Sequence, residues 1–329
     1  MDELELLKEL SSDVDVVDPL ARARTRRLLE EQIRSTGPST GVSRIPRRPL
    51  ESKVAAALVA ALALLIVAIQ LILPLGPNLA QATLGNLARV AEATGSSVLH
   101  PGSYLYVRSS GLVLKTSTDI SSSGDSWSFI VPVRREKWLA SDGSGRVLER
   151  YGRPRFVSRA DRMAWRSAGS PELLASGPSE DAHYGIGVLA PRDLGALPLD
   201  PSRLAALISS GGVATGSNDL SSDSLGVVAA LVGEVPTSPE LRSSVFRATA
   251  EISGIESLGT LSDPAGRVGV GVAIVELGVR TELIFDPTTS ALLSTSVVRV
   301  DAAGLSTQVL FEMTYQQRSV VPSIRARPR

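Results

Sequence analysis

The side chains that most often perform catalysis or bind metals are sparse in this chain. Cysteine is absent, and the two histidines, His100 and His183, lie far apart with no helical ligand spacing. A metal site built on histidines and carboxylates would need more ligands. Both histidines are therefore predicted to be loop or surface residues.

Sequence motifs of enzymes and cofactor sites are also missing. The chain has no G-x-S-x-G elbow, no S-x-x-K, no phosphate-binding loop and no G-x-G-x-x-G after a strand. The segment Asp142-Gly143-Ser144-Gly145 is similar to the start of a calcium loop but lacks the later oxygen ligands and the closing glutamate. We expect a turn there, no catalytic residue, no cofactor and no metal, and hence no enzyme.

Two further patterns each have a chemical and a structural interpretation. The glycines at 269 and 271 alternate with valines, so small residues on one strand face would let a helix or ligand approach closely; packing is the favoured interpretation. Seven arginines between 146 and 166 could form a patch for anionic lipid headgroups or cell-wall phosphate, or simply a solvated hairpin face. The latter is favoured.

The elements that would position any site are divided by one stretch, residues 54–75. These 22 residues carry no charge and include seven Leu, three Ile and three Val. At about 1.5 Å per residue they make a helix of roughly 33 Å, against a hydrocarbon core of about 30 Å. The sequence predicts a single transmembrane helix between a tail, 1–53, and a domain, 76–329.

Basic residues near the span predict its orientation. Five lie within 20 residues before it (Arg34, Arg44, Arg47, Arg48 and Lys53), whereas Arg89 alone lies within 20 after it. Because basic flanks stay in the cytoplasm, the N-terminus is expected inside and the C-terminal domain outside the cell membrane. A cleaved signal peptide is the alternative, with a small-x-small site ending at Ala82, but its apolar core would be about 7–15 residues and its leader shorter.

Composition excludes other classes of function. Lys plus Arg and Asp plus Glu both number 34, so no overall field attracts nucleic acid. Without cysteine the domain has no disulfides. A piece as long as 76–329 can nevertheless bury a core of its own.

The tail is predicted to form two short helices, one acidic over about 1–18 and one rich in arginine from Asp18-Pro19 to about Ile33. Helices this short cannot build a core alone. They are either a docking segment for a cytoplasmic protein, through residues 1–33, or a solvated tail that fixes topology. The basic linker, 35–50, could also touch anionic lipid.

The domain is predicted to be α+β. A helix is expected over 81–93, then strands near 103–108 and 127–133, where Pro132 suggests an edge strand, and a hairpin over 137–151. Helices are expected over 201–209, 225–232 and 239–252. Alternation over 268–274, 280–285, 292–300 and 305–318 predicts a four-stranded antiparallel meander.

A resemblance is carried by several short stretches: Asp18-Pro19 with the arginine-rich helix, the single span, 87–91, 104–107, 239–255, 263–271 and 282–287. In these the chain resembles an uncharacterised family of actinobacterial single-pass membrane proteins, often encoded near extracytoplasmic-function sigma factors. The resemblance implies an outer domain of the lipoprotein-carrier and RseB type, in which helices cover a curved antiparallel sheet around an apolar concavity. The absence of Cys, and of His before residue 100, departs from the zinc-type anti-sigma factors.

Two functions remain open at this point. One is a non-enzymatic membrane protein whose outer domain binds a ligand or partner and which regulates a sigma factor. The other is a membrane-tethered lipid or lipoprotein carrier. Candidate residues of the concave face are also those of an ordinary core: Val131, Val133, Val270, Val272, Phe285, Phe311 and Tyr315.

Overall fold

The computed structural model describes residues 77–94, 99–118, 126–174, 177–190, 194–213 and 223–328. These all belong to one compact unit. The predicted tail and the predicted span, 54–75, lie outside the described residues. Within the described part of the chain, no helix is long and apolar enough to cross a bilayer.

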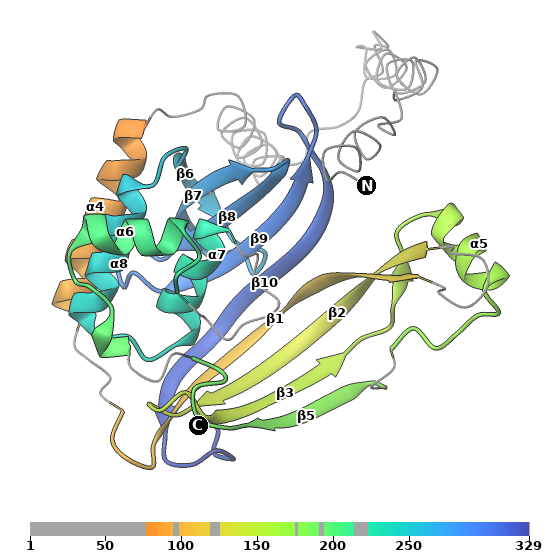
Figure 1. Ribbon diagram of the computed structural model, residues 1–329, viewed down its shortest axis with the longest axis horizontal. Coiled ribbons are helices and arrows are strands. Elements are labelled where there is room, and N and C mark those ends of the chain that lie inside the picture. The colour runs from red at the N-terminus through yellow and green to blue at the C-terminus, as the bar shows by residue number, and fades with distance from the viewer. Residues whose placement is uncertain are drawn as a thin grey trace, which may run out of the picture. The chain divides into compact units, whose positions relative to one another are not determined.

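One antiparallel sheet runs through the whole domain (Figure 1). Its strands follow the order β5-β3-β2-β1-β10-β9-β8-β7-β6, and the sheet is not closed. The strands are β1 (Tyr104–Thr118), β2 (Ser126–Leu139), β3 (Gly145–Tyr151), β4 (Arg155–Phe156), β5 (Ser179–Tyr184), β6 (Glu256–Ser262), β7 (Val268–Glu276), β8 (Val279–Phe285), β9 (Leu292–Val300) and β10 (Ser306–Val321). The short β4 pairs with β2 beyond the end of β3.

The helices gather on one face of this sheet. They are α4 (Pro77–Ala93), α5 (Arg159–Ser167), α6 (Pro201–Ser209), α7 (Ser224–Ala229) and α8 (Pro239–Glu251), with a 3₁₀ turn η1 (Leu194–Ala196) and a π-helical turn η2 (Ala230–Glu234). Figure 1 shows α4, α6, α7 and α8 grouped together, and α4 and α6 each pack against α8. We call the covered side of the sheet the packed face and the other the helix-free face.

Helix starts follow the predicted capping chemistry. Asp200 accepts a hydrogen bond from the Arg203 amide before Pro201, and Ser238 accepts one from the Leu241 amide before Pro239. An N-cap oxygen satisfies an amide that lacks a partner in the first turn, and proline at the first helical position loses no bond. The predictions for 201–209 and 239–252 are thereby confirmed.

The core lies between the helices and the packed face. Leu84, Leu204, Val228 and Phe246 from the helices meet strand residues such as Phe285 in one apolar cluster. A second cluster at the far end of the packed face joins Trp127, Phe129 and Val131 to α5 through Phe156 and Trp165. The expected meander is confirmed as β7 to β10.

One predicted feature of the sheet is wrong. Pro132 suggested an edge strand, but β2 pairs with β1 on one side and with β3 on the other. The carbonyl oxygen of Pro132 accepts a hydrogen bond from Gly152, just past the end of β3. Because the amide and carbonyl of a residue in an antiparallel ladder point the same way, the missing N–H faces the point where β3 stops. Proline therefore costs no bond in an internal strand.

Candidate functional site

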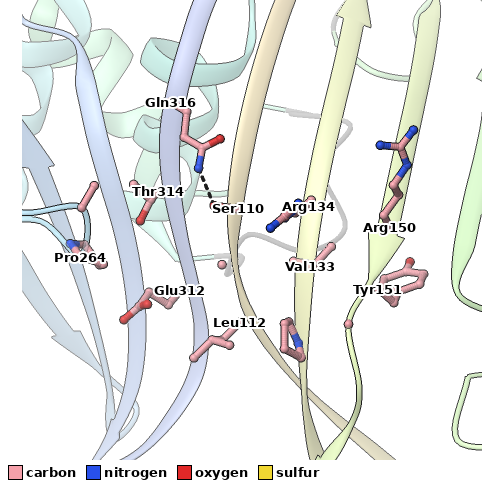
Figure 2. A pocket seen from close by; sticks show the side chains of 14 residues that line it. Ser110, Leu112, Val133, Arg134, Arg150, Tyr151, Pro264, Glu312, Thr314 and Gln316 are labelled. Atoms are coloured by element: carbon pink, nitrogen blue, oxygen red, sulfur yellow. Dashed lines mark hydrogen bonds between the residues drawn. The ribbon is translucent and has the colours of Figure 1, made fainter.

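A hollow lined by charged residues lies on the helix-free face, around the middle strands (Figure 2). It encloses about 640 Å³. Ser110 on β1 stands opposite Arg134 on β2, which in turn stands opposite Arg150 on β3. A second hollow of about 400 Å³ shares Ser110, Arg134, Arg150 and Gln316 with it and adds Arg108. We call the two together the arginine groove.

Among the described residues the three arginines of the groove form no ion pair, and one carboxylate, Glu136, lies directly opposite Arg108 in the strand register. Arg108, Arg134 and Arg150 are exposed, and their guanidinium groups make no hydrogen bond or ion pair with any other described residue. Arg134 and Arg150 are direct cross-strand neighbours, a placement in which Cβ atoms lie about 4.5–5.5 Å apart and like charges are destabilising. This local repulsion would be relieved by an anion bound in the groove.

Polar groups around the arginines complete a binding surface. The Gln316 amide donates to the Ser110 hydroxyl at 2.8 Å, as Figure 2 shows. Gln316 is an extra residue on β10, because the pairing register with β1 shifts between Arg108 and Ser109. Such a bulge redirects a side chain, here toward the groove. Glu136 and Glu312 also line the hollows, and Glu136 lies opposite Arg108 and pairs with Arg327. The groove thus contains three arginines beside two carboxylates.

Directly beneath the groove, the packed face holds a buried layer of charges. The Lys137 ammonium donates to Glu234 at 3.2 Å, and both side chains are 5 % exposed. The Tyr315 hydroxyl donates to the other Glu234 oxygen at 3.0 Å. The two charges can be buried because Lys137 and the Tyr315 hydroxyl both donate hydrogen bonds to the Glu234 carboxylate. Glu234 ends the π-helical turn η2, which aims its side chain at the sheet.

Neighbouring residues of the same layer form a second set of contacts. Arg135 pairs with Glu149, and the Tyr151 hydroxyl donates to the same carboxylate. Charged residues at 134–137 thus alternate between the two faces, with Arg134 in the groove and Arg135 and Lys137 beneath it. The sheet therefore carries positive charge on both faces at this point.

Electrostatics within the layer follow from burial and pairing. Burial alone raises the pKa of the Glu234 carboxyl, but Lys137, Arg135 and the hydrogen bonds outweigh it, and the net pKa is lowered. Burial, with the negative charge of Glu234, holds the pKa of Tyr315 well above its usual value. The arrangement keeps Glu234 ionised and Tyr315 protonated at neutral pH, so the phenol remains a donor.

A third hollow of about 540 Å³ adjoins the groove through Tyr151 and Gly152. It lies between the end of β3 and the segment after α5, where apolar side chains predominate: Pro154, Trp165, Pro171, Leu173 and Leu174. An apolar hollow beside a cationic groove is suited to an amphiphilic ligand with an anionic end.

The structure separates the arginines that the sequence grouped between 146 and 166. Arg146 makes two bonds of 2.7 Å to Asp181 and lies 4.9 Å from the centre of the Trp138 ring. Arg159, Arg162 and Arg166 belong to α5, away from the groove. Arg150 alone of this group joins the groove, where register brings it beside Arg134.

The other residues singled out in the sequence lie in surface, turn or packing positions. His100 and His183 are exposed, as predicted, and the segment 142–145 is a turn in which Asp142 accepts from the Ser144 amide at 2.9 Å. Among the described residues no group of three or more His, Asp or Glu could hold a metal ion. A Cβ at Gly269 would lie 2.6 Å from an Ile284 methyl, so packing between strands, as favoured above, accounts for this glycine.

The candidate concave residues are core residues. Six of them lie beneath the helices and are 0–6 % exposed: Val131, Val133, Val272, Phe285, Phe311 and Tyr315. Val270 is half-buried. The arginine groove itself was not predicted. Its signal was the charged run at 134–137 inside an otherwise alternating strand, which must place charge on both faces of the sheet.

No protein-family model matches the chain, and no curated protein matches it. Among solved structures it is similar to MucB as seen in the crystal structure of MucB in complex with MucA(peri). The identity is 16 %, the match covers 75 % of this chain and 59 % of that one, and the TM-score is 0.26. The chain thus spans less than two thirds of that protein's length in the match. At this TM-score the similarity carries no inference about function.

Proposed function

We propose that this chain is a non-enzymatic, single-pass membrane protein whose extracytoplasmic domain binds an anionic segment of a partner in the arginine groove. The observation that carries the proposal is the set of three exposed arginines that form no ion pair with another described residue, two of which, Arg134 and Arg150, lie directly opposite one another. The location rests on the predicted span, 54–75, and on its basic N-terminal flank.

An anionic partner follows from the chemistry of the groove. Exposed guanidinium groups in a row offer paired donors that suit carboxylates and phosphates. Ser110 and Gln316 add neutral hydrogen-bonding groups at the same surface. Since the strands run side by side here, an extended acidic segment could place successive carboxylates against successive arginines.

Binding of short peptides tests this proposal. We expect an acidic peptide with alternating Glu and Ser to bind the full chain in detergent micelles, and a basic peptide of equal length not to bind. Fluorescence anisotropy should show a weaker affinity for the double variant R134E/R150E, by about tenfold or more, and a loss of affinity with added salt. R203E changes an exposed arginine on α6, away from the groove, and should bind like the unchanged chain. Equal binding by R134E/R150E would exclude the groove as the site.

On the cytoplasmic side, we propose that residues 1–33 contact a partner and transmit the state of the domain. The resemblance to proteins encoded near extracytoplasmic-function sigma factors makes a sigma factor the candidate. Residues 1–53, used as bait, should retain a protein from cytoplasmic extract that a version lacking 2–33 does not. If both retain the same proteins, the relay is excluded.

The alternative is a membrane-tethered lipid or lipoprotein carrier, which the apolar hollow next to the groove favours. A carrier would hold an anionic lipid with its headgroup at Arg134 and Arg150. Native mass spectrometry of the purified chain, followed by solvent extraction, should then reveal a lipid of defined mass. Deleting residues 2–40 separates the two functions, because a carrier should keep working and a regulator should not.

A further inference from the structure

The turn between β7 and β8 carries a leucine in a conformation that leucine disfavours. Leu277 and Gly278 form a two-residue loop between Glu276 and Val279, with φ of 51° and 74°. Two positive φ values are typical of the hairpin turns that usually contain Asn-Gly, because a Cβ is strained there. Leu277 is also 103 % exposed. The position thus combines backbone strain with an apolar side chain wholly in solvent.

Other exposed apolar side chains occupy the same end of the sheet. Val275 precedes this turn and is 48 % exposed. Leu305, in the connection between β9 and β10, is 66 % exposed. The two connections are neighbours, since the amide of Val300 donates to the carbonyl of Gly278 at 2.9 Å. Together they form what we call the hairpin tips, residues 275–279 and 300–306.

The start of α4 lies toward this end of the domain. β6 begins at Glu256, which pairs with Ala273 close to the tip of β7. α4 packs against both α8 and β6, and Glu92 near its C-terminal end bonds to Ser243 and Arg247 in α8. The N-terminal end of α4 is therefore directed toward the start of β6. Figure 1 shows the beginning of α4 and the β9–β10 hairpin at the same, upper, end of the domain.

We propose that the hairpin tips contact the outer leaflet of the membrane that anchors the chain. The uncharged run ends at Leu75, two residues before α4 begins at Pro77, so a chain anchored by it holds this end of the domain near the bilayer surface. Leu79, in the first turn of α4, is another apolar side chain at this end of the domain and is 47 % exposed. Apolar side chains at a membrane interface gain by leaving water, which explains a strained and exposed leucine.

Contact with the bilayer would fix the orientation of the domain as well as its distance from the membrane surface. The inference rests on the proposed membrane location but not on the arginine groove. A domain held by its hairpin tips would keep the groove at a constant angle to the membrane, which a single flexible tether could not do.

Site-specific labelling of the full chain tests the inference, and the absence of cysteine makes each introduced thiol unique. L277C and L305C place a polarity-sensitive fluorophore at the tips, and S262C places it on the exposed last residue of β6, at the other end of β7 and outside the arginine groove. Each labelled chain is reconstituted into nanodiscs of phosphatidylcholine, with and without spin-labelled lipid. We expect at least about twofold quenching at 277 and 305, and none at 262.

Quenching at the tips no stronger than at 262 would overturn the proposal. Shielding from water without lipid quenching would overturn it too, because it would indicate a protein covering the tips. A thiol reagent that cannot cross membranes, applied to intact cells, provides the separate test of location. If S262C is not modified from outside, the proposed topology fails; if it is modified but the tips are not quenched, this inference alone fails.

Discussion

Gly111 lies opposite Met313 where β1 pairs closely with β10. A Cβ there would overlap the carbonyl oxygen of Glu312 and lie 2.9 Å from the Cα of Met313. Both are backbone atoms of a paired strand, so neither can move without breaking the ladder. The glycine is therefore required by the pairing that joins the β2–β3–β5 half of the sheet to the β6–β9 half.

We expect Gly111→Ala to destabilise the domain by about 1–3 kcal/mol, as overpacking does. The midpoint of urea unfolding, followed by tryptophan fluorescence of the full chain in micelles, measures this, because all three tryptophans lie in the described domain. Gly85→Ala is the matched control. Nothing lies within 4 Å of a Cβ at that position of α4, so alanine there should stabilise by about 0.5–1 kcal/mol. If Gly111→Ala leaves the urea midpoint unchanged, β1 and β10 can move apart enough at this point to accept a Cβ.

Leu277→Asn should stabilise the domain by about 0.5–1 kcal/mol. Asparagine tolerates a positive φ better than leucine does, and a side chain that is 103 % exposed loses no burial on replacement. Urea unfolding in micelles again provides the measurement. Val275→Thr, nearby but without strain, should leave the midpoint within error. A destabilised L277N would reveal an intramolecular contact of Leu277 and remove the reason to assign it to the membrane.

At the scale of elements, α4 joins the predicted span to the rest of the domain. Its buried stripe, Leu84, Leu87, Ala88 and Ala91, is 0–1 % exposed against α8 and β6. Because this stripe lies in the main core, α4 is held rigidly rather than serving as a linker. The contact between Glu92 and Arg247 is half-exposed and adds little, as surface ion pairs do.

Leu84→Ala should cost about 2–5 kcal/mol, the usual range for a buried leucine that leaves a cavity. Leu79→Ala, on the exposed side of the first turn, should change the stability by less than about 0.5 kcal/mol. Urea midpoints of the two variants in micelles test the difference. Equal small effects would mean that α4 is not part of the cooperative unit.

Helices and strands could be predicted from the sequence where one side of the element is apolar or where a capping residue and a proline mark its start. β7 to β10 alternate strictly, and α6 and α8 begin with a capping residue followed by proline. β5, β6 and α5 were missed. β5 is an edge strand of mainly exposed polar residues, and α5 buries no residue fully, so neither has the apolar periodicity that reveals an element from sequence.

At the scale of the whole molecule, the buried charges make stability dependent on pH. The pKa of Glu234 is lowered in the folded state, so its contribution is fully present above its unfolded pKa of about 4.3 and is lost as the pH falls through the folded value. Asp161 and Asp286 have lowered pKa values, held by hydrogen bonds that outweigh burial, and act in the same direction. The domain should therefore lose stability below about pH 4–5.

Glu234→Gln tests the buried layer in two ways. At pH 7 it should cost about 3–5 kcal/mol, because it leaves Lys137 buried without a counter-charge. Between pH 7 and pH 3 the variant should then lose less additional stability than the unchanged chain, since the acid-sensitive group is gone. Urea midpoints at several pH values measure both. Glu172→Gln, at an exposed carboxylate, is the control and should keep the original pH dependence.

The sequence by itself determined the α+β class, the strands of the meander, the capped helices and the surface positions of both histidines. These follow from local periodicity and local capping, which need no knowledge of distant residues. The tertiary structure alone decided the arginine groove. Arg108, Arg134 and Arg150 come from three strands. Only the register between those strands places Arg134 opposite Arg150 and brings Arg108, which faces Glu136, to the diagonal position beside Arg134. It likewise decided that Arg135 and Lys137 are buried beneath it, because burial depends on η2 covering that part of the sheet with Glu234. Pairing register and helix coverage are long-range properties, set by the packing of the whole core.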